Sequence, residues 1–433
     1  MRSALSAAEE MNETAVAQML VAARIGCRSA DTQFEREPHL VQTALLYGYR
    51  TFRNTGCGRR RTSRRNRTSE CVNAGDNSAK AWEQTWVPVK RPVVVESEFV
   101  SEVGAPPIEL ALHAINAHWL TSALAAAVTH RVFELLERGP AAVHDVAAGC
   151  NISERGARAL LDALVGAGFV VHADGRYANT ETASCYFVEG KPLYLGQLAR
   201  LSLQLMTRSG GFPDAVAAGH SEASLTARVE VPQWAPLVLA TAPFSLPVAQ
   251  LAAKLLGLAQ RGALEILDPG GGAGVFALSF LKENPLATAT QLDWPSVNRI
   301  AREQAERNQV AARFRTVDGD LFAYDYESAK YDLIVFSHMA HGLAPADNQR
   351  AFQLFRGALK PKGVLLINDL LAELDGSVSP QALVSSARTF FATRDGAGYR
   401  YAEYQEWLGA AGFRSITRHA TGTPTTLILA EVE

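Results

Sequence analysis

A glycine-rich turn between an apolar segment and a helical one constrains the fold of this chain more than any other feature. Gly270, Gly272 and Gly274 alternate directly after the apolar segment that ends in Leu267-Asp268. Such glycines let the backbone turn sharply at a strand end and approach a ligand closely. From there to the last residue, β-rich segments alternate with helical ones, which predicts a mostly parallel α/β sheet with helices on both faces. The expected strands are 264–267, 288–292, 313–317, 331–336, 363–367, 413–418 and 425–430.

Three regions of different composition follow one another along the 433 residues. Residues 1–104 contain six arginines between Arg59 and Arg67, a block that repels itself and buries little apolar surface. We therefore expect a disordered extension there; a nucleic-acid-binding tail and a misassigned start are the alternatives. Residues 105–205 are expected to form a mainly helical domain. Residues 206–433 are expected to form a helical connector followed by the sheet domain.

A winged-helix arrangement is predicted for residues 105–205. Helical periodicity extends from Ile108 to Leu136, and Ser153 is a suitable N-cap for the helix that begins at Glu154. Ala173-Asp174-Gly175 then indicates a β-hairpin. The second helix of the motif consists mainly of alanine, leucine and glycine, whereas DNA binding needs contacts to phosphates. Burial against another subunit or domain is therefore favoured over DNA reading.

Composition argues against several classes of function. The net charge of −2 provides no electrostatic reason for a nucleic-acid or membrane partner. No apolar run is expected to approach the roughly 20 residues of a membrane-spanning helix, and early glutamates argue against a secretory signal. Five scattered cysteines without a C-x-x-C pair predict a reducing, cytoplasmic location. His338 and His341 lie three residues apart without an adjacent third ligand, so no metal site is predicted.

The glycine loop by itself predicts an adenosine-type ligand. Residues 272–277 also fit the dinucleotide pattern G-x-G-x-x-A, and Asp293 ends the second strand, where an acid binds ribose hydroxyls in either case. Asp268, however, would repel a pyrophosphate and attract the cationic amino-acid part of S-adenosylmethionine. After the third strand, Asp320 can accept from an adenine amino group while Leu321 and its apolar neighbours sandwich the ring. These acids favour S-adenosylmethionine.

In order along the chain, these motifs resemble the O-methyltransferases that join a winged-helix dimerisation domain to a class I methyltransferase domain. The resemblance covers roughly residues 105–433 and implies a Rossmann-like domain with a seven-stranded sheet, S-adenosylmethionine as donor, and a homodimer formed through the winged-helix domain. The motifs are Leu267–Gly274, Leu292–Val297, Gly319–Phe322, Tyr331–Ile334 and Ala358–Gly363. The expected donor-binding residues are Asp268, Gly270, Gly272, Asp293, Asp320, Leu321 and Ser337.

The same resemblance indicates the catalytic residues. His341 matches the histidine that deprotonates the acceptor hydroxyl, although Gly342-Leu343 follow it where an acid or histidine and an aromatic residue are usual. Histidine suits this role because a phenol, with a pKa near 10, needs a base at neutral pH. Asp369, at the end of the fifth strand, matches the acid that orients the histidine ring. Tyr401 occupies the place of a second acid, with Glu403 two residues later.

The predicted function is metal-independent methyl transfer from S-adenosylmethionine to a hydroxyl of a small aromatic acceptor resembling a secondary metabolite. Three alternatives stay open: an NAD(P)-dependent oxidoreductase, a winged-helix ligand-sensing regulator, and a methyltransferase-like protein without activity. Neither the acceptor nor the methylated atom (oxygen, nitrogen, carbon or sulfur) is predicted. Candidates for an apolar acceptor pocket are Met206, Phe212, Trp234, Phe244 and Met339.

Overall fold

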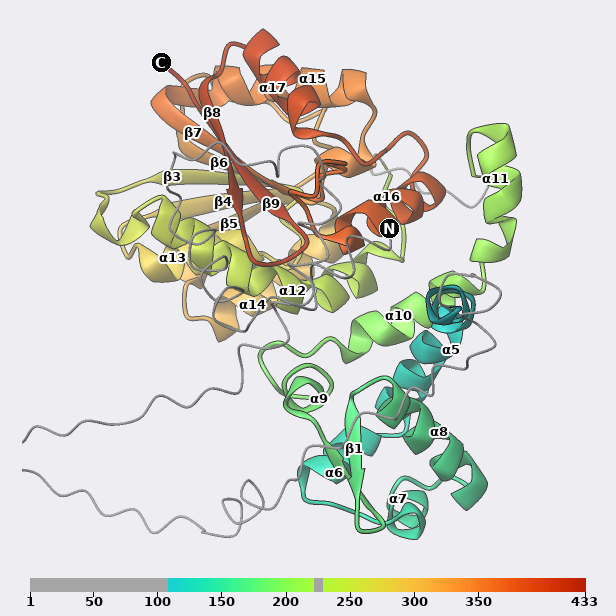
Figure 1. Cartoon of the computed structure of the whole chain (residues 1–433). Helices are drawn as coiled ribbons and strands as arrows, with labels where there is room; N and C mark the ends of the chain where they lie inside the picture. The colour runs from blue at the N-terminus through green and yellow to red at the C-terminus, as the bar shows by residue number, and fades with distance from the viewer. Residues whose placement is uncertain (1–107, 222–228) are drawn as a thin grey trace, which may run out of the picture. The chain divides into compact units, whose positions relative to one another are not determined.

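The computed structural model describes residues 108–221 and 229–433, all of which belong to one compact unit spanning residues 96–433 (Figure 1). The extension predicted for residues 1–104, with its arginine-rich block, lies outside the described residues.

The first part of the described chain has the predicted helix–turn–helix and hairpin. Ser153 caps the second helix of the motif, since its Oγ accepts a hydrogen bond from the Gly156 N–H at 3.1 Å. The hairpin turns at Asp174 and Gly175, both with positive φ, as a two-residue hairpin turn requires. The elements are α5 (Glu109–Thr129), α6 (Val132–Glu137), α7 (Val143–Gly149), α8 (Glu154–Gly166), β1 (Val170–Ala173), β2 (Arg176–Asn179), α9 (Glu181–Tyr186) and α10 (Gly196–Met206).

The helical stretch predicted from Ile108 to Leu136 is divided into α5 and α6. Arg131, between them, has φ 59°, in the left-handed region that ends a helix. The break lets α6 bury Phe133 and Leu136 in the core of this domain. Because the residues on both sides of Arg131 favour a helix, periodicity alone does not reveal the turn; packing of α6 decides it.

The second part contains a seven-stranded sheet in the order β5-β4-β3-β6-β7-β9-β8. All neighbouring pairs from β5 to β7 are parallel, and β9 is antiparallel to both β7 and β8. The predicted strands are all present, within a few residues of their expected ends. Their bounds are β3 (Glu265–Pro269), β4 (Thr288–Asp293), β5 (Phe314–Asp318), β6 (Tyr331–Ser337), β7 (Leu359–Asp369), β8 (Arg414–Ala420) and β9 (Thr426–Glu431).

Helices cover both faces of this sheet (Figure 1). One core packs α12 (Trp234–Leu255), α13 (Val275–Glu283) and α14 (Pro295–Arg307) against the sheet around Phe276 and Phe280. A second core packs α15 (Pro345–Ala358) and α17 (Tyr401–Ala410) around Phe352 and Trp407. The carboxyl ends of the parallel strands meet at one edge, where ligands bind in open α/β sheets. The remaining elements are α11 (Phe212–Ala218) and α16 (Pro380–Ala392), with short 3₁₀ turns η3 (Ser209–Gly211), η4 (Leu258–Gln260), η5 (Ala311–Arg313) and η6 (Ala340–Gly342).

The expectation that no apolar run approaches the length of a membrane span is wrong for α12. By length and composition this 22-residue helix could cross a membrane. It contains Pro243 and Pro247, and it buries Ala249, Ala252 and Ala253 in the core shared with α13. Part of its apolar surface is therefore used for packing within the domain.

Candidate active site

The loop between β3 and α13 has a backbone that favours glycine. Gly270, Gly272 and Gly274 have φ values of 71°, 60° and 78°, in the left-handed region. Space is restricted as well, because a Cβ on Gly270 would lie 2.4 Å from the Sδ of Met339. The Gly270 N–H donates to the Leu292 carbonyl at 2.8 Å, which joins the loop to the end of β4. Backbone conformation therefore favours glycine at all three positions, and the contact with Met339 adds to this at Gly270.

Asp268, near the end of β3, carries a buried carboxylate with few partners. Its Oδ2 accepts a hydrogen bond from the Ala277 N–H at 3.3 Å, and its Oδ1 has no hydrogen-bond partner within the described ranges. Burial raises the pKa of Asp268 to about 7; the hydrogen bond from Ala277 opposes this shift and the negative charge of Asp293 adds to it. A carboxylate held in this way fits a cationic group of a ligand, whose charge would compensate its burial.

Asp293 ends β4 and connects it to the loop. Its Oδ2 accepts from the Gly272 N–H at 2.9 Å, and its Oδ1 accepts from the Trp294 N–H at 2.7 Å. Burial raises the pKa of Asp293 to about 6 in spite of these two hydrogen bonds, with Glu230 adding to the shift. The carboxylate thus orients the loop and borders the same ligand space as Asp268.

A cavity of about 600 Å³ lies beside this loop. Its size suits a small-molecule site, and the glycine backbone together with the incompletely bonded Asp268 fits S-adenosylmethionine. Leu198 and Ser202 of α10 contribute to its wall. The predicted site residues that line it are Asp268, Gly270, Gly272, Asp293, Ser337 and His341.

Two predicted donor-binding residues do not line this cavity. The Oδ1 of Asp320 accepts from the Phe322 N–H at 2.9 Å, as in a local turn, and Leu321 is buried in the core that contains α15 and α17. Among the apolar candidates, Trp234, Phe244 and Met339 line the cavity. Met206 and Phe212 do not, and the ring of Phe212 packs edge-on against Phe390. Sequence spacing did not separate these two groups, because core and pocket residues share the same chemistry.

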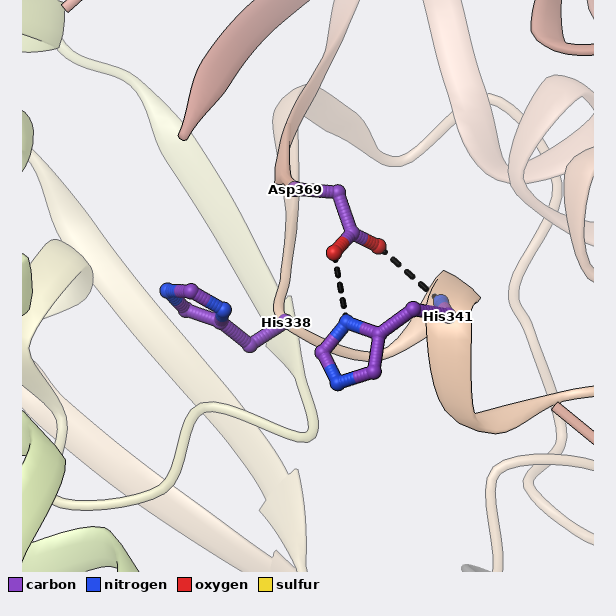
Figure 2. Close-up of side chains that lie close together, drawn as sticks. All are labelled: His338, His341 and Asp369. Atoms are coloured by element: carbon purple, nitrogen blue, oxygen red, sulfur yellow. Dashed lines mark hydrogen bonds and ion pairs between the residues drawn. The ribbon is translucent and has the colours of Figure 1, made fainter. Parts of the chain in front are cut away.

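His341 and Asp369 form a hydrogen-bonded pair (Figure 2). The His341 Nδ1 lies 2.5 Å from the Asp369 Oδ1, and the backbone N–H of His341 donates to the Oδ2 at 3.0 Å. The Oδ1 also accepts from the Leu370 N–H at 2.8 Å, and the Oδ2 from the Tyr404 hydroxyl at 3.2 Å. Asp369 itself is 0% exposed. Four contacts thus hold this carboxylate in place.

The protonation of this pair follows from these contacts. Burial by itself raises the pKa of Asp369, but the charge of His341 and the hydrogen bonds that the carboxylate accepts outweigh burial, so its pKa lies below the ordinary value. The ionised Asp369 accepts a hydrogen bond from the Nδ1–H of His341, so Nε2 is the ring nitrogen that does not face the carboxylate. In Figure 2 the Nε2 lies on the side of the ring away from Asp369. This is the geometry of a general base oriented by an acid.

His338 lies close to this pair. Burial lowers its pKa to about 4; Asp369 opposes the shift, and His341 and Arg388 add to it. Its Nε2 is buried and makes no hydrogen bond to the part of the chain that the structure describes. His338 is therefore a neutral imidazole with one unused polar atom, and it lines the cavity.

The expectation that His338 and His341 have no third potential metal ligand is wrong, since Asp369 joins them. One ligand atom from each residue lies within 4.8 Å of the others. In a tetrahedral site with bonds near 2.0 Å, ligand atoms lie roughly 3.3 Å apart. The His341 Nδ1 and the Asp369 Oδ1 are instead 2.5 Å apart, as in a hydrogen bond. The arrangement favours an acid–base pair over a metal centre.

Sequence reasoning missed the tyrosine at this site. The Tyr401 hydroxyl donates to the Ile416 carbonyl, and Glu403 accepts from the Arg400 N–H at the start of α17. Neither residue forms a hydrogen bond with Asp369 in the described structure, whereas the Tyr404 hydroxyl does. One signal was present, because Tyr404 is one helical turn beyond Tyr401.

Sequence reasoning also missed two side-chain amides, Gln291 and Asn298, that support the glycine loop between β3 and α13. Gln291 is a fully buried amide in β4, and its Nε2 donates to the Gly272 carbonyl and to the Asn298 Oδ1, each at 3.0 Å. Asn298 in turn donates to the Asp318 carboxylate at 2.7 Å. A buried amide in a central strand was the available signal.

Two family models match the chain. The O-methyltransferase domain matches residues 251–414, and the O-methyltransferase dimerisation domain matches residues 112–189. The second match covers the helix–turn–helix and hairpin, and the first covers most of the seven-stranded sheet.

Known proteins resemble the chain over most of their length. The 3-hydroxy-5-methyl-1-naphthoate 3-O-methyltransferase of Streptomyces sahachiroi is 30% identical over 308 residues, covering 69% of this chain and 87% of the relative. The tetracenomycin polyketide synthesis 8-O-methyl transferase of Streptomyces glaucescens is 27% identical over 319 residues, covering 71% of this chain and 91% of the relative.

Solved structures agree with this relationship. A Nostoc punctiforme protein assigned to the O-methyltransferases has a TM-score of 0.70 and 28% identity, covering 76% of this chain and 99% of its own. Human N-acetylserotonin methyltransferase, solved with S-adenosylmethionine, shares the fold at a TM-score of 0.65 and 24% identity, covering 75% of this chain and 97% of its own. The oxidoreductase and regulator alternatives are not supported. The chain belongs to the S-adenosylmethionine-dependent O-methyltransferases that carry an N-terminal dimerisation domain.

Proposed function

We propose that this enzyme methylates a hydroxyl of a small aromatic acceptor resembling a secondary metabolite, with His341 as general base and Asp369 as the residue that positions it. The main support for this proposal is the hydrogen-bonded pair of His341 and Asp369, of which His341 lines the same cavity as the glycine loop. The names of the two Streptomyces relatives, which act on a naphthoate and in tetracenomycin polyketide synthesis, support an aromatic acceptor.

The reaction needs alignment and removal of one proton. When bound, S-adenosylmethionine supplies a methyl group activated on a sulfonium. His341 takes the acceptor hydroxyl proton on Nε2 as that oxygen bonds to the methyl group. Asp369 stabilises the imidazolium that results, because its ionised carboxylate contacts the Nδ1. We propose that no metal takes part, since these side chains hold the proton at each stage.

The donor-binding roles follow the distribution of charge. We propose that Asp268 meets the ammonium group of the donor, for which its Oδ1 is available. Asp293 is placed to accept from ribose hydroxyls. For the adenine end we keep Asp320 and Leu321, which directly follow β5. The loop glycines Gly270 and Gly272 and the strand-end Ser337 complete the set, and all three line the cavity.

We further propose a homodimer formed through residues 105–205, ahead of the catalytic part in 206–433. The match to a dimerisation domain supports this, as does the exposed apolar surface of α5, where Leu110 is 79% and Trp119 66% exposed. We expect cytoplasmic enzyme without nucleic-acid or membrane partners. The thiols Cys150 and Cys185, free among the described cysteines, fit a reducing compartment.

Replacement of the base tests the proposed function. His341→Ala should lower turnover roughly 100-fold or more, the usual size of general-base catalysis. Turnover is measured as the mass gain of one methyl group over a library of hydroxylated aromatic compounds. The affinity for S-adenosylhomocysteine, measured by calorimetry, should stay unchanged. His144→Ala, at an exposed position on α7, is the matched control. Wild-type turnover in His341→Ala would remove His341 from the mechanism.

A further inference from the structure

The cavity has two chemically different walls. From α12 it receives mainly apolar side chains, among them Trp234 and Phe244. From α16 it receives Gln381, Ser385 and Arg388, an amide, a hydroxyl and a guanidinium. Their spacing of four and three residues places these three on one face of the helix. A ligand that matches both walls carries an apolar body and a polar or charged substituent.

Arg388 is a cation without a protein partner. Arg388 lines the cavity, and its side chain forms no hydrogen bond or ion pair with residues 108–221 or 229–433. The residue as a whole is exposed to solvent, while partial burial of the guanidinium lowers its pKa. A guanidinium presents a rigid fork of donors that matches the two oxygens of a carboxylate. The missing partner is therefore best supplied by an anionic group of a ligand.

Arg388 lies near His338, which also lines the cavity. Its positive charge contributes to the lowered pKa of His338, as does that of His341. The unused Nε2 of His338 lies at the same end. Arg388 and the His338 Nε2 are thus two polar groups without a partner in the described ranges, and the His338 ring centroid lies 6.0 Å from that of His341, the proposed base.

We propose that Arg388 binds a carboxylate of the acceptor, which is therefore a hydroxylated aromatic carboxylic acid whose ring contacts the apolar side chains of α12. This inference rests on the proposed function, because it takes His341 to mark the position of the reacting hydroxyl. The methyl donor also carries a carboxylate, which could bind a guanidinium in the same way as the carboxylate of the acceptor. The affinity of the Arg388 variants for S-adenosylhomocysteine distinguishes the two.

The test is equilibrium binding to the full-length enzyme saturated with S-adenosylhomocysteine. The probes are hydroxybenzoic and hydroxynaphthoic acids, each paired with its uncharged primary amide, and affinity is measured by calorimetry. Wild type should bind the acids at least roughly 10-fold more tightly than the amides. Arg388→Gln should abolish this preference, and Arg388→Lys should retain part of it. Arg307→Gln, at an exposed position at the end of α14, should behave as wild type.

Three results would overturn the proposal. The first is a wild type that binds no acid, or binds the amides as well as the acids. The second is an Arg388→Gln variant that keeps the preference for acids. The third is a loss of S-adenosylhomocysteine affinity in Arg388→Gln, which would assign the guanidinium to the donor. Failure of the proposed function would give a different result. His341→Ala would then keep wild-type turnover, while Arg388→Gln would still lose the preference for acids.

Discussion

Two buried aspartates at the ends of parallel strands behave in opposite ways. Asp268 near the end of β3 is 1% exposed, and Asp369 at the end of β7 is 0% exposed. Burial raises the pKa of the first to about 7, whereas the pKa of the second lies below its ordinary value in spite of the same burial. The difference comes from their partners.

Asp268 accepts one hydrogen bond and has an unused oxygen, while Asp369 accepts four and contacts a histidine. Burial penalises a charged carboxylate, and only donors or an opposite charge offset that penalty. Asp369 is therefore complete within the protein and suits a positioning role. Asp268 has an unused oxygen, which we propose a cationic ligand contacts. The partners of the two strand-end aspartates thus suggest a structural role for one and a ligand-binding role for the other.

The largest expected effect is the loss of turnover on replacing Asp369, the carboxylate with four hydrogen bonds. Asp369→Asn should lower turnover roughly 100-fold or more, because the amide can donate to Nδ1 and move the histidine proton to Nε2, where the base is needed. Affinity for S-adenosylhomocysteine should not change, since Asp369 does not line the cavity. Steady-state kinetics and calorimetry measure the two effects. Asp325→Asn, at an exposed position, is the control, and undiminished turnover in Asp369→Asn would show that the acid does not orient the base.

An intermediate effect, on ligand affinity, is expected on replacing Asp268, the carboxylate with an unused oxygen. Asp268→Asn should weaken S-adenosylhomocysteine binding roughly 10-fold or more, because a charge-assisted hydrogen bond to the ligand ammonium is lost. Wild-type affinity should itself fall as the pH decreases below about 7, where Asp268 gains a proton. Calorimetry between pH 5 and pH 8 checks both statements. Equal affinities of wild type and variant at pH 8 would exclude contact with the ammonium.

The same substitution should stabilise the ligand-free protein. The pKa of Asp268 is raised on folding, from 3.8 to about 7, so the folded form holds its proton more tightly. Its contribution to stability is complete below the unfolded pKa and is lost as the pH rises through about 7. The melting temperature of Asp268→Asn relative to wild type should therefore increase as the pH rises from 4 to 7. At pH 8 the variant should melt roughly 3 °C or more above wild type. A variant less stable than wild type at pH 8 would contradict this account.

The smallest effect is expected at the tyrosine that supports Asp369. Tyr404→Phe removes one of the four hydrogen bonds to the carboxylate and keeps the packing of the ring. The remaining three should hold the pair, so turnover should fall only a few-fold, in line with the roughly 1 kcal/mol of a single hydrogen bond. Tyr401→Phe, whose hydroxyl contacts the Ile416 carbonyl instead, is the matched control. A 100-fold loss in Tyr404→Phe would indicate that the tyrosine does more than support the acid.

Local pattern was sufficient for the framework of the site. Alternating glycines after an apolar segment indicate a strand–loop–helix turn wherever they occur, because few other residues adopt those φ values at low cost. Polar residues that directly follow apolar strands are brought to one edge by parallel pairing. For these reasons Asp268 and Asp293 could be selected before the structure was known, whereas the resemblance to the O-methyltransferases indicated His341 and Asp369.

Tertiary structure decided what those residues do. Asp268 and Asp369 both lie at or near the end of an apolar strand, and their opposite pKa shifts depend on their partners from other elements. Asp268 has Ala277, nine residues away, whereas Asp369 has His341 and Tyr404, 28 and 35 residues away. Helical spacing related Tyr404 to Tyr401 but could not show which of the two contacts Asp369, and it could not show that Arg388 lines the cavity, because both depend on how the helices pack. The sequence by itself determined the strand ends, the glycine loop and the family. Only the fold determined which charges have partners, because partnership is a contact between residues far apart in the chain.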